Sequence, residues 1–486
     1  MIQLADIVAA LRSAGLLVRA PAVDATVKSV AEDSRSVQPG ALFCAIAGTV
    51  ADGHGFVGDA AQRGAIAAMV AHPVDVSLPQ VIVSESRWAA GVAAREFYGR
   101  PADRMILVGV TGTNGKSTTV SIIRHLLNRN QSAGSVGTLG AIDGRGDKLS
   151  GFGSLTTPGP VEFQSVLAAL ASRGVTAVAA EASSHGLDQE RLRSTSFRAA
   201  VYTNLTHEHL DYHPDLQAYA SAKMKLSALV EPEGIEVVNA DDTAWAMLPQ
   251  RSGVRRLWYG RGSDVTVRAV DERLSASGAS CVFQFGREEH EVTLPLLGEY
   301  NVTNALAGSA TAWGLGEDPA RIVERLRDTP QVPGRMERLA TGPFTVLRDY
   351  AHTPDGFERA IVTIKAITAG RLFVLFGCGG DRDREKRPIM GSTAARFADL
   401  VILTDDNPRT EEPRRILDDI ERGIGTAEHL TIPDRERAIH EVITMLRSGD
   451  CLLLLGKGHE TYQIYGTEKQ PFDERAIVQA AMRERA

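Results

Sequence analysis

The feature that most constrains the fold is an apolar, strand-like run followed by a glycine-rich loop and a helical stretch. Residues 105–110 read MILVGV, the continuous apolar pattern of a strand buried on both faces. The loop TGTNGKST follows at 111–118, and residues 119–128 have helical character. Glycines let backbone N–H groups approach phosphate oxygens, and a helix N-terminus adds partial positive charge. The segment therefore predicts a phosphate-binding loop at the edge of a parallel sheet.

Lys116 and Ser117 carry the side chains that such a loop needs. A lysine at this position reaches the β- and γ-phosphates, and the hydroxyl that follows ligates Mg²⁺. The loop departs from the common pattern because Val110 takes the place of the first glycine, with Gly109 and Gly112 on either side. The flanking strand and helix favour a variant phosphate-binding loop over a chance glycine-rich turn.

Glu181 is a candidate for the carboxylate that a phosphate site needs near its metal ion. It follows the apolar run 175–180, so it would end a strand and face the phosphates. The alternative is a surface glutamate at a strand end. Lys223 and Lys225 lie on a helical stretch, residues 219–229, where composition alone favours a solvated helix face.

His209 belongs to a short segment that is rich in imidazoles and carboxylates. The segment reads THEHLDYH over 206–213 and also contains His207, Glu208 and Asp211. A zinc site is conceivable with such ligands. However, histidines at i and i+2 do not share a helix face and no cysteine is nearby, so a structural role is favoured.

The chain length predicts three domains, since 486 residues are present and a domain usually has about 100–200. Glycine- and proline-marked breaks occur at 97–104 (FYGRPADR) and at 332–334 (VPG). Strands alternate with helices, which implies parallel sheets. We therefore predict an α/β protein with domains at 1–100, 101–333 and 334–486.

Composition places the chain among ordinary globular proteins. A net charge of −7 argues against a nucleic-acid partner.

No apolar run approaches the ~18 residues of a membrane span, so no membrane anchor is expected. The N-terminus predicts an amphipathic helix with Leu4, Ile7, Val8 and Leu11 on one face, not a signal peptide. The 4 cysteines are far apart, which predicts buried thiols in a reducing, cytoplasmic compartment.

Three apolar strands near the C-terminus each run into a charged loop marked by glycine or proline. RLFVLFG leads into CGGDRDREKRP, ADLVILT into DDNPRTEEP, and CLLLLG into KGHETYQ. In open parallel sheets, ligands lie outside the carboxyl ends of the strands. The loops therefore predict one shared ligand site, although any single loop is also explained by ordinary surface polarity.

These segments together resemble the Mur ligases of peptidoglycan synthesis, three-domain enzymes that form amide bonds with ATP. The resemblance implies an N-terminal UDP-binding domain, a central P-loop ATPase domain and a C-terminal Rossmann-like domain. It also implies ATP and Mg²⁺ as cofactors, small-molecule substrates, an acyl-phosphate intermediate and, we expect, a monomer. The matching segments are TGTNGKST (111–118), LTTPGP (155–160), EASSHGL (181–187), TNLTHEHLDYH (203–213), GEYNVTNALA (298–307), PGRMER (333–338), DYAHTPDG (349–356), GGDRDREKRP (379–388), DDNPRTEEP (405–413) and GKGHETYQ (456–463).

The resemblance assigns residues to the nucleotide and the metal ion. Catalytic roles are implied for Lys116, Glu181, His209 and Lys223. Lys223 matches a lysine that the family carbamylates, which would make it an anionic Mg²⁺ ligand together with Ser117, Glu181 and His209. The positions that match ATP contacts are Gly112, Thr113, Asn114, Gly115, Lys116, Ser117, Thr118, Asn304, Arg335 and Asp349.

The resemblance also assigns two substrate pockets. Positions that match contacts to the UDP-muramoyl-dipeptide are Ser34, Thr49, Val50, Ala51, Thr156, Thr157, Ser183, Gln189 and Arg191. Positions that match contacts to the incoming amino acid are Arg382, Asp406, Asn407, Pro408, Arg409, Gly456 and Glu460. The members of this second set fall on the strand-end loops that already predicted a shared site.

Arg409 bears on which amino acid is added. Meso-diaminopimelate has a second carboxylate that lysine lacks, and an arginine binds a carboxylate through two parallel hydrogen bonds. In the family, the pattern Asp406-Asn407-Pro408-Arg409 accompanies diaminopimelate, so we expect that substrate, with a lysine-adding ligase as the alternative.

The sequence is also compatible with two other functions. They are a folylpolyglutamate synthetase-like ligase and a nucleotide-driven switch or transport ATPase. A non-catalytic UDP-sugar-binding module would need neither Lys116 nor Glu181. His352 is a candidate general base, with a structural or nucleotide-side role equally open.

Overall fold

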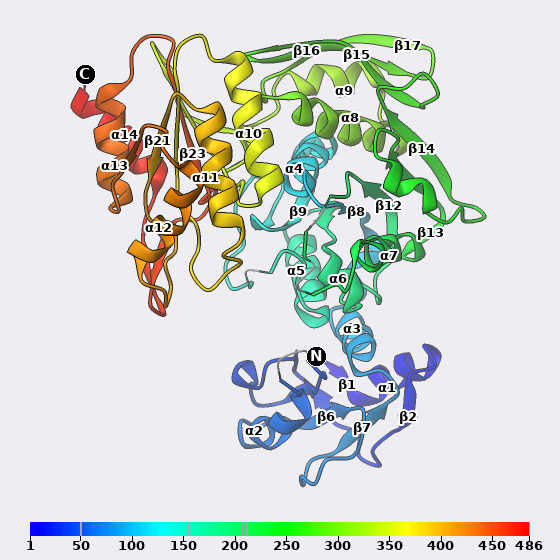
Figure 1. The fold of residues 1–486 in the computed structure, drawn as a ribbon. Coiled ribbons are helices and arrows are strands. Elements are labelled where there is room, and N and C mark those ends of the chain that lie inside the picture. Colours follow the sequence, from blue (N-terminus) through cyan, green and yellow to red (C-terminus); the bar gives the residue numbers. More distant parts are fainter. Residues whose placement is uncertain (49–50, 154, 207, 210–211, 486) are drawn as a thin grey trace. The chain divides into compact units, whose positions relative to one another are not determined.

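The computed structural model describes residues 1–48, 51–153, 155–206, 208–209 and 212–485. The chain divides into two compact units, Met1–Arg268 with Leu306–Ile322, and Ala269–Ala305 with Val323–Ala486. Each unit is built from sheets covered by helices (Figure 1). The predicted α/β class is confirmed, whereas the domain boundaries at 100 and 333 stay predictions.

The N-terminal sheet has strand order β2-β7-β6-β5-β4, parallel from β4 to β7 and antiparallel at β2. Alternate residues of β5 and β6 pack toward α1 and α3 or toward α2, so both faces are buried. The predicted helix at the N-terminus is confirmed, with Leu4, Ile7, Val8 and Leu11 buried. The elements are β1 (Ile2–Gln3), α1 (Leu4–Ser13), β2 (Leu17–Arg19), β3 (Thr26–Val27), β4 (Ser29–Ala31), β5 (Ala41–Cys44), α2 (Val57–Gln62), β6 (Ala67–Val70), β7 (Gln80–Val83) and α3 (Ser86–Phe97).

The central sheet is parallel from β9 through β11, β8, β12 and β13 to β14, and β10 pairs antiparallel with β9. The β8 strand lies in the middle of this order, so the loop after it is flanked by strands on both sides. The elements are β8 (Ile106–Thr111), α4 (Lys116–Leu127), β9 (Ala133–Gly137), β10 (Gly140–Ile142), α5 (Pro160–Ser172), β11 (Ala177–Glu181), α6 (Ser184–Asp188), β12 (Phe197–Tyr202), α7 (Leu216–Ala228), β13 (Val230–Asn239) and β14 (Arg255–Gly260).

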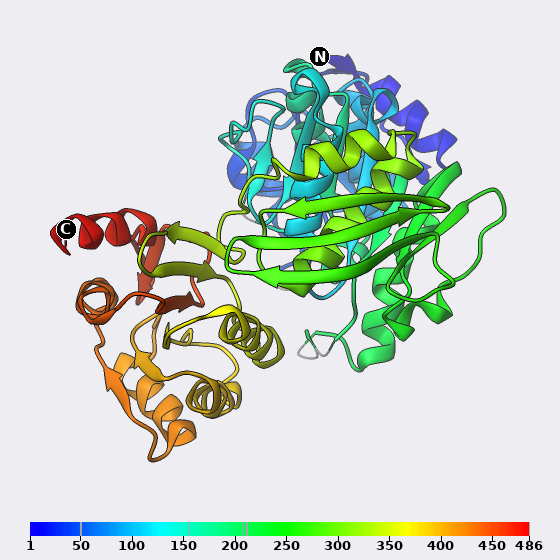
Figure 2. The ribbon, with the colours of Figure 1, turned by 90° about the horizontal axis from the view of Figure 1, so that it is seen from above.

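A run of longer strands and two helices follows the central sheet in the sequence. The β16 and β17 strands form an antiparallel pair, which is seen among the long green strands of Figure 2. The elements are β15 (Val267–Ser275), β16 (Gly278–Phe285), β17 (Glu288–Leu294), α8 (Glu299–Gly314) and α9 (Pro319–Leu326).

The C-terminal sheet has strand order β18-β19-β23-β20-β21-β22 and is parallel except at β18. Helices cover both of its faces (Figure 2). Alternate residues of β20 point to opposite cores: Val374 packs with α10, α11 and α12, and Phe373 and Leu375 pack with α13 and α14. The elements are β18 (Glu337–Ala340), β19 (Thr345–Asp349), α10 (Pro354–Ile367), β20 (Leu372–Phe376), α11 (Lys386–Phe397), β21 (Leu400–Leu403), α12 (Pro413–Ile424), β22 (His429–Thr431), α13 (Arg435–Met445), β23 (Cys451–Leu455), β24 (Tyr462–Tyr465), β25 (Glu468–Pro471) and α14 (Glu474–Arg485).

All four cysteines are described, and each is a buried thiol, as the sequence predicted. Burial raises the pKa of the Cys378 and Cys451 thiols to about 12, which makes them poor nucleophiles. Among the helices that the structure describes, none has the length and apolar character needed to cross a membrane.

An ion pair between Arg435 and Glu474 joins α13 to α14, with 2.7 Å between Nη2 and Oε1 and both side chains fully buried. We expect Glu474→Ala to destabilise the protein by about 3–5 kcal/mol, because the guanidinium is left buried without its carboxylate. Thermal denaturation measures the loss. Glu441→Ala removes an exposed ion pair with Arg437 and serves as the control. An equal shift in the two variants would contradict the importance of the buried pair.

Candidate active site

The loop between β8 and α4 has the geometry of a phosphate-binding loop. Gly112 and Gly115 adopt φ values of 145° and 85°, which residues other than glycine rarely adopt. A Cβ on Gly112 would lie 1.9 Å from Thr203 Oγ1, so this position also requires glycine for space. Lys116 and Ser117 begin α4, where the helix N-terminus is directed at the loop.

The loop is held by the segment after β12. Thr203 Oγ1 donates to the Asn114 carbonyl at 2.7 Å, and the Asn114 N–H donates to Asn204 Oδ1 at 2.9 Å. The Thr113 N–H donates to the Asn204 carbonyl at 2.7 Å. These bonds come from residues just after the neighbouring parallel strand, so that strand determines where the loop lies.

Two lysines donate to one backbone carbonyl of this loop. Lys223 Nζ lies 2.7 Å from the Gly112 oxygen, and Lys116 Nζ lies 3.0 Å from it. Lys223 is 1% exposed and lies over the Tyr219 ring. Its pKa is well below the usual lysine value because burial disfavours the cation and Lys116 repels it. The solvated helix face that composition favoured for Lys223 is therefore wrong, whereas Lys225 is exposed and pairs with Asp188.

Glu181 ends β11 as predicted, and its carboxylate is buried instead of lying on the surface. It accepts hydrogen bonds from the backbone N–H and from Oγ1 of Thr138, at 2.9 and 3.1 Å. Carboxylate and hydroxyl oxygens, as supplied by Glu181 and Ser117, are the ligands that Mg²⁺ prefers. The donor chemistry of the described residues therefore fits that ion.

The residues expected to contact the dipeptide form one polar network beside Glu181. Thr157 Oγ1 donates to the Glu181 carbonyl at 2.8 Å and lies 3.0 Å from Ser183 Oγ. Arg191 donates to the Thr157 carbonyl at 2.7 Å and to Gln189 Oε1 at 2.8 Å. Thr156 Oγ1 lies 3.1 Å from Thr138 Oγ1, which links the same network to the carboxylate.

His209 is exposed and has a φ of 58°. Its ring packs edge-on against His185 with a centroid distance of 4.8 Å, and its Nε2 lies 3.9 Å from a Glu208 carboxylate oxygen. His207 and Asp211, the other members of the zinc alternative, lie outside the described residues. Across the described ranges, no group of three or more His, Cys, Asp or Glu residues is arranged to hold a metal ion.

The expected UDP-pocket residues lie in the N-terminal part of the chain. Ser34 begins the 3₁₀ turn Ser34–Ser36 and is partly buried, and Ala51 is exposed. Thr49 and Val50 lie outside the described residues.

The remaining nucleotide candidates lie in the second compact unit. Asp349 ends β19 and accepts from the backbone N–H groups of Met336 and Ala351 at 2.7 and 2.8 Å. Burial raises the pKa of Asp349, and the nearby Arg335 opposes that shift. The Arg335 guanidinium lies 4.9 Å from the Tyr350 ring centre, and Asn304 donates to Asn301 Oδ1 at 3.1 Å.

The loops after β21 and β23 meet in one polar cluster, as the sequence predicted. Asn407 Nδ2 donates to Glu460 Oε2 at 2.8 Å. Lys457, which is fully buried, donates to Asn407 Oδ1 at 3.0 Å and lies 3.2 Å from Asp406 Oδ1. Burial raises the pKa of Glu460, and the bond from Asn407 opposes the rise.

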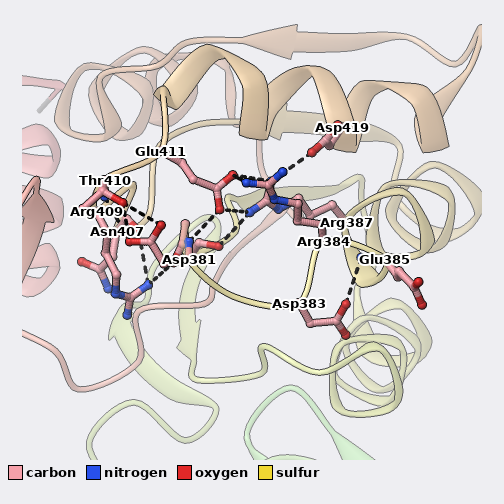
Figure 3. Close-up of polar contacts among 12 residues, drawn as sticks. Asp381, Asp383, Arg384, Glu385, Arg387, Asn407, Arg409, Thr410, Glu411 and Asp419 are labelled. Atoms are coloured by element: carbon pink, nitrogen blue, oxygen red, sulfur yellow. Dashed lines mark hydrogen bonds and ion pairs between the residues drawn. The ribbon is translucent and has the colours of Figure 1, made fainter. Parts of the chain in front are cut away.

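Arg409 brings the third loop, after β20, into the same region (Figure 3). Its Nη1 donates to the Gly380 carbonyl at 2.8 Å, and the Gly380 N–H donates to the Asn407 carbonyl at 2.9 Å. Pro408 is buried in this loop, and Arg382 is exposed. Gly456, with a φ of 103°, starts the loop that carries Glu460. His352 is exposed, and its Nδ1 lies 2.9 Å from the Tyr350 carbonyl.

Three residues that organise the site were missed by sequence reasoning: Thr138, Asn204 and Lys457. Asn204 and Lys457 each lie just after the end of a buried strand, in segments that already contain predicted site residues. Their position after a strand end was therefore the signal in the sequence that could have identified them. Thr138 follows β9 in a segment with no charged residue, and its bond to Glu181 spans 43 positions. Nothing local in the sequence marks it.

Three segments of the chain match models of known protein families. Residues 26–96 match the Mur ligase family catalytic domain, residues 110–312 the Mur ligase middle domain, and residues 334–458 the Mur ligase glutamate ligase domain. A relative from Aquifex aeolicus is 39% identical over 93% of both chains, and one from Thermosynechococcus vestitus is 41% identical over 96% of this chain and 95% of its own. Both are named UDP-N-acetylmuramoyl-L-alanyl-D-glutamate–2,6-diaminopimelate ligase.

Solved structures of Mur ligases are also similar to this chain. A structure of an enzyme with that same name is 32% identical, with a TM-score of 0.69 over 94% of this chain and 95% of the other. MurF ligase from Thermotoga maritima, solved in complex with ADP, shares the fold at 19% identity and a TM-score of 0.66 over 95% of this chain and 98% of its own. These matches confirm the predicted three-domain architecture, and the chain belongs to the Mur ligase family.

Proposed function

We propose that this Mur ligase uses ATP to join meso-2,6-diaminopimelate to UDP-N-acetylmuramoyl-L-alanyl-D-glutamate. The observation that carries the proposal is the cluster at the strand ends of the C-terminal sheet. There Asp406, Asn407 and Glu460 are hydrogen-bonded or ion-paired through Lys457, and Arg409 is held beside them. The names of relatives that are about 40% identical over nearly the full chain support the same substrate.

The cluster suits an amino acid that is charged at its far end. The distal end of meso-diaminopimelate carries an ammonium and a carboxylate, whereas lysine carries an ammonium alone. Asp406 and Glu460 supply negative charge, and Arg409 supplies a planar guanidinium that can bind a carboxylate with two hydrogen bonds. A lysine substrate would leave that guanidinium without its anion, which disfavours the lysine-adding alternative.

The β8–α4 loop is the proposed site for the ATP phosphates. Backbone N–H groups from Gly112 to Thr118 and the start of α4 present positive potential, and Lys116 is placed to move from the loop carbonyls to a phosphate. Ser117, Glu181, His209 and carbamylated Lys223 are the proposed Mg²⁺ ligands. When bound, Mg²⁺ neutralises charge on the phosphates.

The proposed chemistry activates a carboxylate before an amide is made. The γ-phosphoryl group moves to the D-glutamate side-chain carboxylate, the amine of diaminopimelate attacks the acyl phosphate, and phosphate leaves. Lys116 stabilises the phosphoryl group, while Thr157, Ser183 and Arg191 orient the dipeptide. We also propose that the enzyme acts as a monomer. The buried thiols and the use of ATP fit a cytoplasmic reaction.

The buried amine of Lys223 supports its carbamylation. A lysine reacts with CO₂ only as the uncharged amine, and burial lowers the pKa of Lys223 so that this form is favoured. The carbamate is anionic, so it would also offset the nearby charge of Lys116.

The function is tested by measuring phosphate release from Mg-ATP and UDP-N-acetylmuramoyl-L-alanyl-D-glutamate, with meso-diaminopimelate or L-lysine in parallel. We expect turnover only with diaminopimelate, and mass spectrometry identifies the amide. Turnover with lysine alone would contradict the role given to Arg409. ATP hydrolysis that is indifferent to both amino acids, with no amide formed, would instead support a nucleotide-driven switch. Glutamylation of a folate substrate would support the folylpolyglutamate synthetase-like alternative.

Gly112→Ala is expected to weaken nucleotide binding by about tenfold or more, equivalent to about 1.4 kcal/mol. The added Cβ would collide with Thr203 Oγ1 and strain a φ of 145°, so the loop must shift. Titration calorimetry with Mg-ADP measures the affinity. Gly99→Ala, at a φ of 72° with no atom within 4 Å of the added Cβ, introduces strain without collision. Equal affinities in the two variants would refute the role of the loop.

Lys223→Met is expected to raise the melting temperature near pH 7 in CO₂-free buffer. Because the folded-state pKa of Lys223 is lowered, the unfolded chain binds more protons, and wild-type stability rises with pH toward the ordinary lysine pKa of about 10.4. The variant lacks this contribution, so its advantage shrinks as the pH rises. Lys116 still donates to the Gly112 carbonyl.

Scanning fluorimetry across that pH range measures the difference, with the exposed Lys225→Met as control. Identical pH dependence in wild type and Lys223→Met would contradict the burial of an uncharged amine. In ¹³C-bicarbonate, a carbamate NMR signal is expected from the wild type and not from Lys223→Met.

A further inference from the structure

We propose that Glu411 and Arg387 are positioning residues that hold Arg409 in place for the distal carboxylate of diaminopimelate. The inference rests on the proposed function, because it takes Arg409 as the residue that meets that carboxylate. Neither residue belongs to the predicted pocket. Both lie in the charged loops around the strand ends of the C-terminal sheet, Glu411 before α12 and Arg387 at the start of α11 (Figure 3).

Glu411 ties the loop after β21 to the loop after β20. Its Oε1 accepts from the Asp381 backbone N–H at 2.6 Å. In return, the Asp381 carboxylate accepts from Thr410 Oγ1 at 2.8 Å and from the Thr410 N–H at 3.2 Å. The two loops are therefore joined in both directions: each supplies one carboxylate, Glu411 or Asp381, that accepts hydrogen bonds from the other loop.

Arg387 fixes the orientation of the Glu411 carboxylate. Its Nη2 and Nη1 lie 2.9 and 3.2 Å from the two Glu411 oxygens, and Nη1 also donates to Asp419 on α12 at 2.9 Å. The Arg387 side chain is 1% exposed, so these charges are shielded from water. The bonds from Arg387 lower the pKa of Glu411 to about 2, so the carboxylate stays ionised at neutral pH.

The same loop carries the acceptor that orients Arg409. Arg387 Nη2 also lies 3.3 Å from the Gly379 carbonyl, and the next carbonyl, that of Gly380, accepts from Arg409 Nη1 at 2.8 Å. A Cβ on Gly380 would lie 1.8 Å from the Pro408 oxygen, so the two loops are in tight contact there. Loosening residues 379–381 therefore removes the support of the guanidinium.

The backbone of Arg409 is held separately. Its N–H donates to the Ile464 carbonyl at 3.0 Å, and its carbonyl accepts from the Gly466 N–H at 2.7 Å. Its φ of 53° is one that residues other than glycine rarely adopt. Loss of Glu411 should consequently change the direction of the Arg409 side chain while leaving its backbone in place.

The test compares Glu411→Gln with Asp450→Asn in the full-length enzyme. Gln keeps the size of Glu411 and removes its charge. Asp450 is the matched control, because it is also a buried carboxylate paired with an arginine, Arg371, and the two residues directly precede β23 and β20 of the same sheet. It precedes β23 and therefore lies at the amino ends of the strands, away from the loops that contain Arg409.

The first readout needs no substrate. Hydrogen exchange is followed by mass spectrometry in peptides that cover residues 379–382. We expect faster exchange in Glu411→Gln and unchanged exchange in Asp450→Asn. Unchanged exchange in Glu411→Gln would overturn the proposal whatever the enzyme's substrate.

The second readout is kinetic. We expect Glu411→Gln to raise the KM for meso-diaminopimelate on the order of 10-fold or more, with the KM values for ATP and the muramoyl-dipeptide unchanged. Discrimination against L-lysine should fall by a similar factor. Equal changes for all three substrates, or the same change in Asp450→Asn, would indicate general loosening and overturn the positioning role. A wild type that makes no amide with diaminopimelate would instead refute the proposed function.

Discussion

Parallel strand pairing confines the chemistry of this chain to the ends of its strands. A parallel sheet with helices on both faces has no polar face, and alternate residues of β20 enter two separate hydrophobic cores. Polar side chains of the strands can then meet a ligand only where the strands end. Gly112 follows β8, Glu181 ends β11, and Gly456 follows β23, so a strand sets the position of each of these three residues.

Buried basic side chains are the second feature that organises the structure. The groups that surround them differ from one side chain to the next. Lys223 is buried and lies near the cation of Lys116, and both effects favour its uncharged form. Arg387 is surrounded by carboxylates and stays charged. Lys457 is buried among Asp406, Asn407 and Glu460. Arg387 and Lys457 each join separate segments around the strand ends through their carboxylate partners.

Much of this was accessible from the sequence. The phosphate loop, the position of Glu181 at a strand end and the convergence of Asn407 with Glu460 all follow from local patterns, because a strand of known direction places its own final residue. Lys223 shows the limit: composition favoured a solvated helix face, and only the family resemblance assigned it to the site. Burial of one helical lysine depends on what packs against that helix, which local sequence does not state.

The α/β class and the Mur ligase family can be read from the chain alone, because the alternation of strands with helices and each family motif involve residues that are close together in the chain. Which distant groups meet is visible only in the folded protein. The bond from Lys223 to the Gly112 carbonyl spans 111 positions, and that from Lys457 to Asn407 spans 50. The reason is physical: a short range of sequence sets backbone conformation and strand direction, whereas burial, pKa and side-chain partners are set by segments that come together only when the sheets form.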